Sequence, residues 1–264
     1  MIQALCLTAE ILSPVALSPK EQYIHYIRLT RRCCHKHEYK LAAICADKAL
    51  ETRVCLDAFE EEEFFPSTLI ELEKYEQAKD LTLRLAPLQR NSPRCAPIAA
   101  FRQELMGRAY MGLHQYQSAV EEFGREIPDL VPENRTRQGL ELRLFVACMC
   151  TGDNKSAKKV LNHLLESRHM FDHSFCIVDE NNPIITLFEP MITLSLNDGT
   201  AAKNICDKHI QFWQKTENFD DPDAVPMLEG ASQVMLNRGY IDESRGLTAC
   251  AKHIKLMLGA NAVF

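Results

Sequence analysis

The segment 101–132 constrains the fold more than any other part of the chain, because small and aromatic residues recur in it at helical spacing. Two expected helices flank a short turn at 112–114, and a proline closes the segment. The residues that set the pattern are Met106, Gly107, Tyr110, Tyr116, Ala119, Phe123 and Pro132. Small residues let two helices cross closely, and aromatic rings fill the space around such a crossing. The segment therefore predicts two helices packed across a tight turn.

This arrangement resembles one unit of the tetratricopeptide repeat, a helix–turn–helix motif of about 34 residues. The small residue of the second helix recurs along the chain, at intervals somewhat longer than that ideal. These positions are Ala42, Ala78, Ala119, Ala157, Ala202 and Ser244. Because one helix pair cannot bury its own apolar face, such units stack. The resemblance implies an all-α fold, a right-handed α-solenoid of about six helix pairs. It would form one domain over 1–264, with 1–20 as an N-terminal packing segment.

In two of the expected helix pairs, the first helix carries a proline at the position where the segment 101–132 carries Gly107. These prolines are Pro66 and Pro190. Proline inside a helix removes a backbone hydrogen bond and clashes with the preceding turn. We therefore expect these two helices to be kinked or to begin at the proline, and the second and fifth pairs to be the least regular.

The charge balance and hydropathy of the chain limit its partners. The net charge is −6, the pI is near 5.9, and no dense Lys/Arg stripe is present, so a nucleic-acid partner is not expected. No apolar run approaches the roughly 20 residues of a membrane span. The segment 1–20 has no basic residue before its apolar run, so we do not expect a signal peptide. A cytoplasmic location follows as the expectation.

The chain has 11 cysteines, and none of them forms a C-x-x-C pair. Most lie on expected apolar helix faces, where free cysteine packs as a small hydrophobe. These are Cys45, Cys55, Cys148, Cys150, Cys206 and Cys250. We expect buried free thiols in a reducing compartment.

Three clusters carry residue types that bind ligands. The Cys-Cys-His-Lys-His stretch at 33–37 has metal-type ligands, but it falls where a helix ends, so its side chains would point apart. On a helix, His169 and His173 would share a face. The glutamates at 60–63 would either bind a basic partner or form the solvent-exposed start of a helix. Nucleophile, phosphate-binding and dinucleotide motifs are absent from the sequence. We expect no enzyme, no metal and no cofactor, with a helical enzyme that uses the two histidines as a weaker alternative.

The resemblance also implies a binding surface, because the first helices of successive tetratricopeptide units line a concave groove. The positions that it places there are Ile24, Ile27, Arg31, Phe101, Glu104, Arg108, Met111, Leu142, Val146, Met149, Leu187 and Met191. Chaperone-binding members hold a C-terminal carboxylate there with Lys, Asn and Arg side chains. Ile27, Arg31, Leu142 and Val146 stand at the matching positions here, so that set of side chains is not reproduced and a co-chaperone of that type is not expected.

An apolar groove of this kind suits a partner helix or peptide laid along it. We therefore expect a protein–protein interaction scaffold, an adaptor subunit of a larger assembly. The alternative is a regulatory protein whose solenoid changes curvature when a peptide binds. Two further occupants of the groove remain open: the N-terminal segment of the chain itself, or a second copy or other subunit in a homo- or hetero-oligomer.

Overall fold

The computed structural model describes residues 17–36, 38–52, 64–89, 95–125, 135–167, 199–215 and 224–260. Regular structure in this part of the chain is entirely helical, which confirms the all-α class for it. The helices are α2 (Pro19–His35), α3 (Tyr39–Thr52), α5 (Phe65–Glu71), α6 (Tyr75–Gln89), α7 (Cys95–Gly112), α8 (Tyr116–Phe123), α9 (Arg135–Thr151), α10 (Asn154–Ser167), α12 (Gly199–Lys215), α13 (Ala224–Asn237) and α14 (Ile241–Ala260). Among these helices, none combines the length and the hydropathy that crossing a membrane requires.

Many helices that follow one another along the described chain pack side by side, and one turn design joins five of the pairs. In each turn, a backbone N–H donates to the carbonyl five residues earlier. The donors are Glu38, Lys74, Gln115, Asp153 and Tyr240. Where the preceding residue is described, it has a positive φ: 57° at Glu73 and His114, 79° at Gly152 and 83° at Gly239. This is the Schellman arrangement, which satisfies the last carbonyls of one helix before the next begins.

The small residues predicted for the second helices are all buried. Five of them lie four residues beyond the turn donors, in the first turn of the second helix, and Ala202 lies in α12. Ala119 has no exposed surface, and Ser244, the most exposed of the six, is only 6% exposed. At the best unit, a Cβ placed on Gly107 would lie 2.1 Å from the Phe123 ring. The predicted close crossing of α7 and α8 is therefore confirmed.

The sequence predicted that the helix containing Pro66 would either be kinked or begin at the proline. The structure confirms the second expectation. Helix α5 starts at Phe65, places Pro66 in its first turn, where no intrahelical N–H bond is lost, and ends after seven residues. Pro190 lies outside the described residues. The segment 1–16 also lies outside the described residues. Pro19 and Lys20 belong to α2 and not to a separate packing segment.

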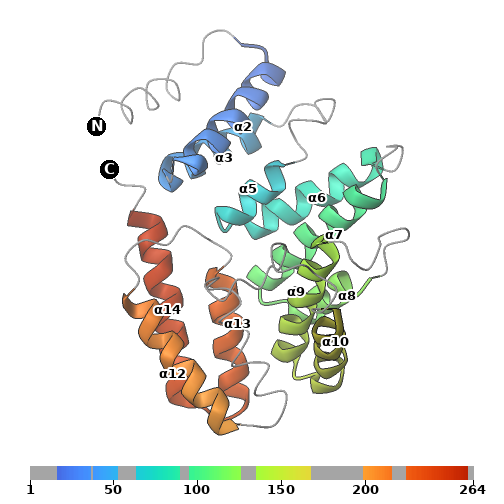
Figure 1. Cartoon of the computed structure of the whole chain (residues 1–264). Coiled ribbons are helices and arrows are strands. Elements are labelled where there is room, and N and C mark those ends of the chain that lie inside the picture. The colour runs from blue at the N-terminus through green and yellow to red at the C-terminus, as the bar shows by residue number, and fades with distance from the viewer. Residues whose placement is uncertain are drawn as a thin grey trace.

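The C-terminal helices make contacts that a plain stack of units would lack. In Figure 1, α5 to α10 follow α2 and α3 down one side, and α12 to α14 return on the other side toward α3. Helix α13 contacts α7 and α9, and α14 contacts α3. In a regular repeat array each unit touches only its neighbours. We call α13 and α14 the C-terminal arm, because together they fold back onto earlier helices.

Two buried clusters form the core. One is built from α2, α3, α5 and α6 together with Leu105 of α7, and the other from α7 to α14, including the fully buried Trp213. The ring of Tyr39 packs against both clusters. The arm therefore joins the second core directly and reaches the first through α3.

The left-handed backbone at Glu73 gives a test of the turn design. A side chain with a Cβ at this φ costs roughly 1 kcal/mol, and glycine does not incur that cost. Both Glu73→Gly and Glu73→Ala remove the same carboxylate. We expect the glycine variant to be the more stable of the two by about 1 kcal/mol, measured by urea unfolding. Equal stabilities would mean that this turn is not left-handed in solution.

Candidate partner-binding site

The middle of the predicted groove is covered by the chain itself. Met111, Val146 and Met149 are 7%, 1% and 2% exposed. Helix α13 lies over them: a Cβ on its Gly230 would be 3.1 Å from the Cys150 sulfur and 3.7 Å from both Met111 and Val146. The Cys150 thiol also donates to the Gly230 carbonyl at 3.5 Å. The occupant here is therefore α13, whereas the sequence analysis considered a partner helix, the N-terminal segment and a second copy or other subunit.

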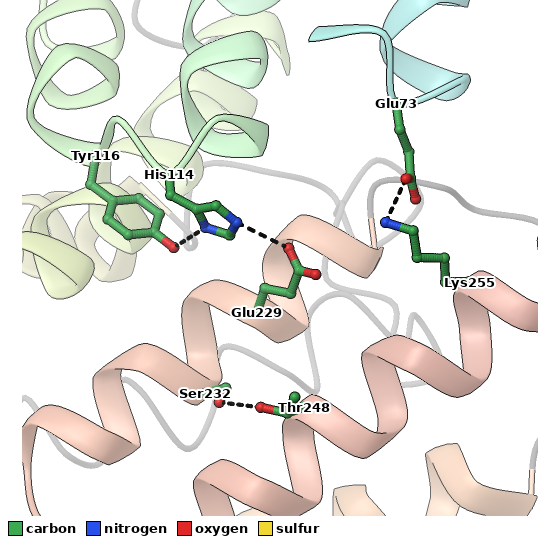
Figure 2. A network of polar contacts seen from close by, with 7 residues as sticks. All are labelled: Glu73, His114, Tyr116, Glu229, Ser232, Thr248 and Lys255. Carbon is green, nitrogen blue, oxygen red and sulfur yellow. Dashed lines mark hydrogen bonds and ion pairs between the residues drawn. The ribbon is translucent and has the colours of Figure 1, made fainter.

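Polar contacts tie the arm to two of the turns (Figure 2). Lys255 of α14 pairs with the Glu73 carboxylate at 2.6 Å. His114 Nε2 lies 3.7 Å from a Glu229 oxygen of α13, and its Nδ1 is 2.8 Å from the Tyr116 hydroxyl. The left-handed turn residues therefore have a second role, because their side chains meet the arm.

Glu104 and Arg108, which the sequence analysis placed in the groove, are paired within the molecule. The Glu104 carboxylate lies 3.2 Å from Arg143 and 4.0 Å from Arg108. The Arg108 side chain is only 13% exposed. Leu142 is half-buried against the larger core. Leu187 and Met191 lie outside the described residues.

An accessible part of the predicted surface is a pocket of about 300 Å³ between α2 and α5. Its apolar wall combines the predicted Ile27 with Phe64, Phe65 and Thr68. Its rim is basic and comes from the C-terminal half of α2, with Arg28, Arg31, Arg32, His35 and Lys36. We call this the α2–α5 pocket.

Phe64 connects two predicted residues that are far apart in the sequence. Its ring carries the Arg31 guanidinium at 5.6 Å on one side and lies 5.8 Å from the Phe101 ring. Nevertheless, Phe64 is 49% exposed. The structure thus brings Ile27, Arg31 and Phe101 into one region and adds Phe64 and Phe65, which the sequence prediction missed. Pro66 was the sequence signal that could have identified Phe64, because a helix that starts at this proline leaves Phe64 at its exposed end.

Local sequence explains why α2 presents this rim. A capping box of Ser18 and Glu21, followed by Pro19, fixes the start of the helix. From there, apolar residues at helical spacing face α3 and α5, while the basic side chains are exposed. Phe65 anchors the second wall, since it is 1% exposed and its ring meets Tyr23 edge-on at 6.4 Å.

The described residues that line the pocket include five basic side chains and no acidic one. Arg28 and Arg32 also interact with other groups of the chain. Arg31, His35 and Lys36 are exposed, and the Arg31 guanidinium faces the Phe64 ring. The site can therefore offer hydrogen-bond donors and positive charge beside an aromatic surface.

The cysteine-histidine stretch at 33–37 is divided between core and solvent. Cys33 and Cys34 are buried free thiols, whereas His35 is exposed at the pocket. Burial raises the pKa of Cys34 to about 12, so its thiol remains neutral near pH 7. Within the residues that the structure describes, no three His, Cys, Asp or Glu side chains gather to hold a metal ion. His37, His169 and His173 lie outside those residues.

The other described cysteines behave as the sequence predicts. Cys45, Cys148, Cys150, Cys206 and Cys250 are buried and free. Burial raises the pKa of Cys150 and Cys206 to about 12, and that of Cys148 and Cys250 to about 11. These thiols therefore serve as packing groups near neutral pH. Cys55 is outside the described residues.

Comparison with known proteins assigns no family. No protein-family model matches the chain, and no functionally curated protein matches it.

Proposed function

We propose that this protein is an interaction scaffold, an adaptor subunit that holds a segment of a partner protein at the α2–α5 pocket. The observation that carries the proposal is the pairing of the half-exposed Phe64 ring with the exposed Arg31 beside an apolar wall. Aromatic residues and arginine are enriched in protein–protein interfaces and among their hot spots. The tetratricopeptide resemblance supports the same function.

The pocket is a better candidate than the middle of the groove because it is open in this structure. A partner at Val146 or Met149 would have to displace α13 first, whereas Arg31 and Phe64 are already exposed. The separation of the two regions also gives the proposal a clear test, since substitutions at the pocket leave the contacts of α13 intact.

The test is affinity purification from the native cell, with the recovered proteins quantified by mass spectrometry. We expect Arg31→Glu and Phe64→Ala each to reduce recovery of the same partner by about tenfold or more, as hot-spot truncations do. Arg84→Glu is the matched control, because Arg84 is an exposed arginine on α6 that does not line the pocket. Circular dichroism checks that all variants fold. Identical partner sets for the parent and both pocket variants would reject the pocket as the docking site.

A second candidate is the peptide-responsive regulator, which the contacts of the arm favour. Helices α2 and α3 pack together, α3 contacts α14, and Lys255 of α14 pairs with Glu73. A ligand that moves α2 would therefore act on α14 of the arm through α3, which contacts both helices. Hydrogen exchange of α13 and α14, with and without saturating partner, tests this idea. Unchanged exchange in both helices would leave the adaptor as the better description.

A further inference from the structure

Resting on the proposed function, we infer that the α2–α5 pocket binds an acidic segment of a protein partner. In this arrangement an apolar side chain of the segment enters between Ile27 and Phe65. Flanking Asp or Glu carboxylates meet Arg31, His35 and Lys36.

The positive charge of the pocket is local. The chain carries a net charge of −6, yet among the described residues that line this pocket every ionisable side chain is basic. A concentration of one sign of charge in a recess attracts and orients ligands of the opposite sign. The ligand that complements this pocket is therefore anionic.

Helix stability does not explain this charge pattern. Arg28 and Arg32, and Arg32 and Lys36, are spaced i,i+4 along α2 and its cap. Like charges at this spacing destabilise a helix by roughly 0.2–0.5 kcal/mol per pair. Favourable interaction with the helix dipole is confined to the last turn, where Arg32 and His35 lie. Arg28 and Arg31 precede that turn.

Arg31 is arranged to accept a carboxylate. Its guanidinium carbon lies over the Phe64 ring, 5.6 Å from the ring centroid. The planar guanidinium group matches a carboxylate through two parallel hydrogen bonds. In the part of the chain that the structure describes, Arg31 contacts this ring and no carboxylate. His35 and Lys36 follow it on the exposed rim.

The apolar wall and the size of the pocket select a peptide from among the anions. A bare inorganic anion would leave the half-exposed Phe64 ring uncovered, although this ring lines the same space. A volume of about 300 Å³ is at the lower end for ligand pockets, so it suits one side chain with its neighbours. A nucleic acid would need an extended basic surface to bind its phosphates.

The test is selection of a random peptide library displayed on phage against the full-length protein, with Arg31→Glu as the counter-target. We expect the enriched peptides to carry Asp or Glu around one apolar residue. Synthetic copies should bind Arg31→Glu and Lys36→Glu about tenfold or more weakly than the parent. They should bind Arg84→Glu as they bind the parent, and affinity should fall as salt rises.

Other outcomes would overturn the inference. Enriched peptides without an acidic excess, or with equal affinity for Arg31→Glu, would show that charge does not select the ligand. Displacement of the peptide by inorganic phosphate at equal concentration would indicate a small-anion site. Binding that appears only after the glutamates at 60–63 are replaced by glutamine would identify the chain itself as the occupant. If peptide selection fails while Arg31→Glu still loses a cellular partner, the acidic ligand is rejected and the adaptor function stands.

Discussion

Ala119→Glu is expected to destabilise the protein by roughly 3–5 kcal/mol, the cost of leaving a buried charge uncompensated. Ala119 has no exposed surface and lies in α8 where that helix crosses α7. A glutamate side chain has no room there, because Gly107 and the Phe123 ring already meet at this crossing. Urea unfolding followed by circular dichroism measures the change in the free energy of unfolding.

The matched control is Ala249→Glu, which makes the same substitution at an exposed position of α14. We expect its stability to stay within about 0.5 kcal/mol of the parent. If Ala119→Glu does not yield folded protein, Gly107→Ala is a milder probe of the crossing. Its Cβ would lie 2.1 Å from the Phe123 ring, so about 1–3 kcal/mol should be lost. A parent-like unfolding midpoint for both variants would show that the α7–α8 register is wrong.

Gly230→Glu is expected to detach α13 from α7 and α9. The new Cβ would lie 3.1 Å from the Cys150 sulfur and would place a carboxylate against Met111 and Val146. None of these groups can satisfy a charge. The contact of α13 with α7 and α9 should therefore be destabilised by roughly 2–5 kcal/mol, by analogy with other buried charges. Amide exchange in α9 and α13 should accelerate, and the radius of gyration in solution scattering should increase.

Gly139→Glu is the control for this variant. Gly139 lies in α9, and a Cβ there would meet only the Arg143 guanidinium, at 3.3 Å. A glutamate at this position would be spaced i,i+4 from that arginine, which favours the helix. Parent-like exchange in Gly230→Glu would show that α13 does not cover the groove in solution. Gain of a new partner by the same variant would show that the apolar positions beneath the arm bind once they are exposed.

The sequence predicts the local architecture well, because that architecture depends on short-range patterns. Gly107 and Ala119 predict a close crossing, since only small residues fit between two helix backbones, and both are buried there. Pro66 predicts a helix start for the same kind of reason, because its ring and missing N–H are tolerated only in the first turn. These expectations depend on residues a few positions apart.

The candidate site was predicted only in part, because its walls come from distant segments. Ile27 and Arg31 were placed on a binding face, but their surroundings depend on Phe64, which α5 brings alongside α2. Glu104 and Arg108 were predicted to lie on the binding face, yet the Glu104 carboxylate pairs with both Arg108 and Arg143. No local pattern distinguishes a charged side chain that awaits a partner from one that already has a partner in the next helix.

What the sequence alone determined is the helical class of the described segments and the small residues at their crossings, through periodicity and steric size. What only the tertiary structure decided is which apolar face is covered. Val146 has the same pattern whether a partner or the chain itself lies over it, and the contact between Cys150 and Gly230 joins residues 80 positions apart. Burial is a property of the folded whole, so the covered groove and the open α2–α5 pocket could be separated only once α13 and α5 had been placed in space.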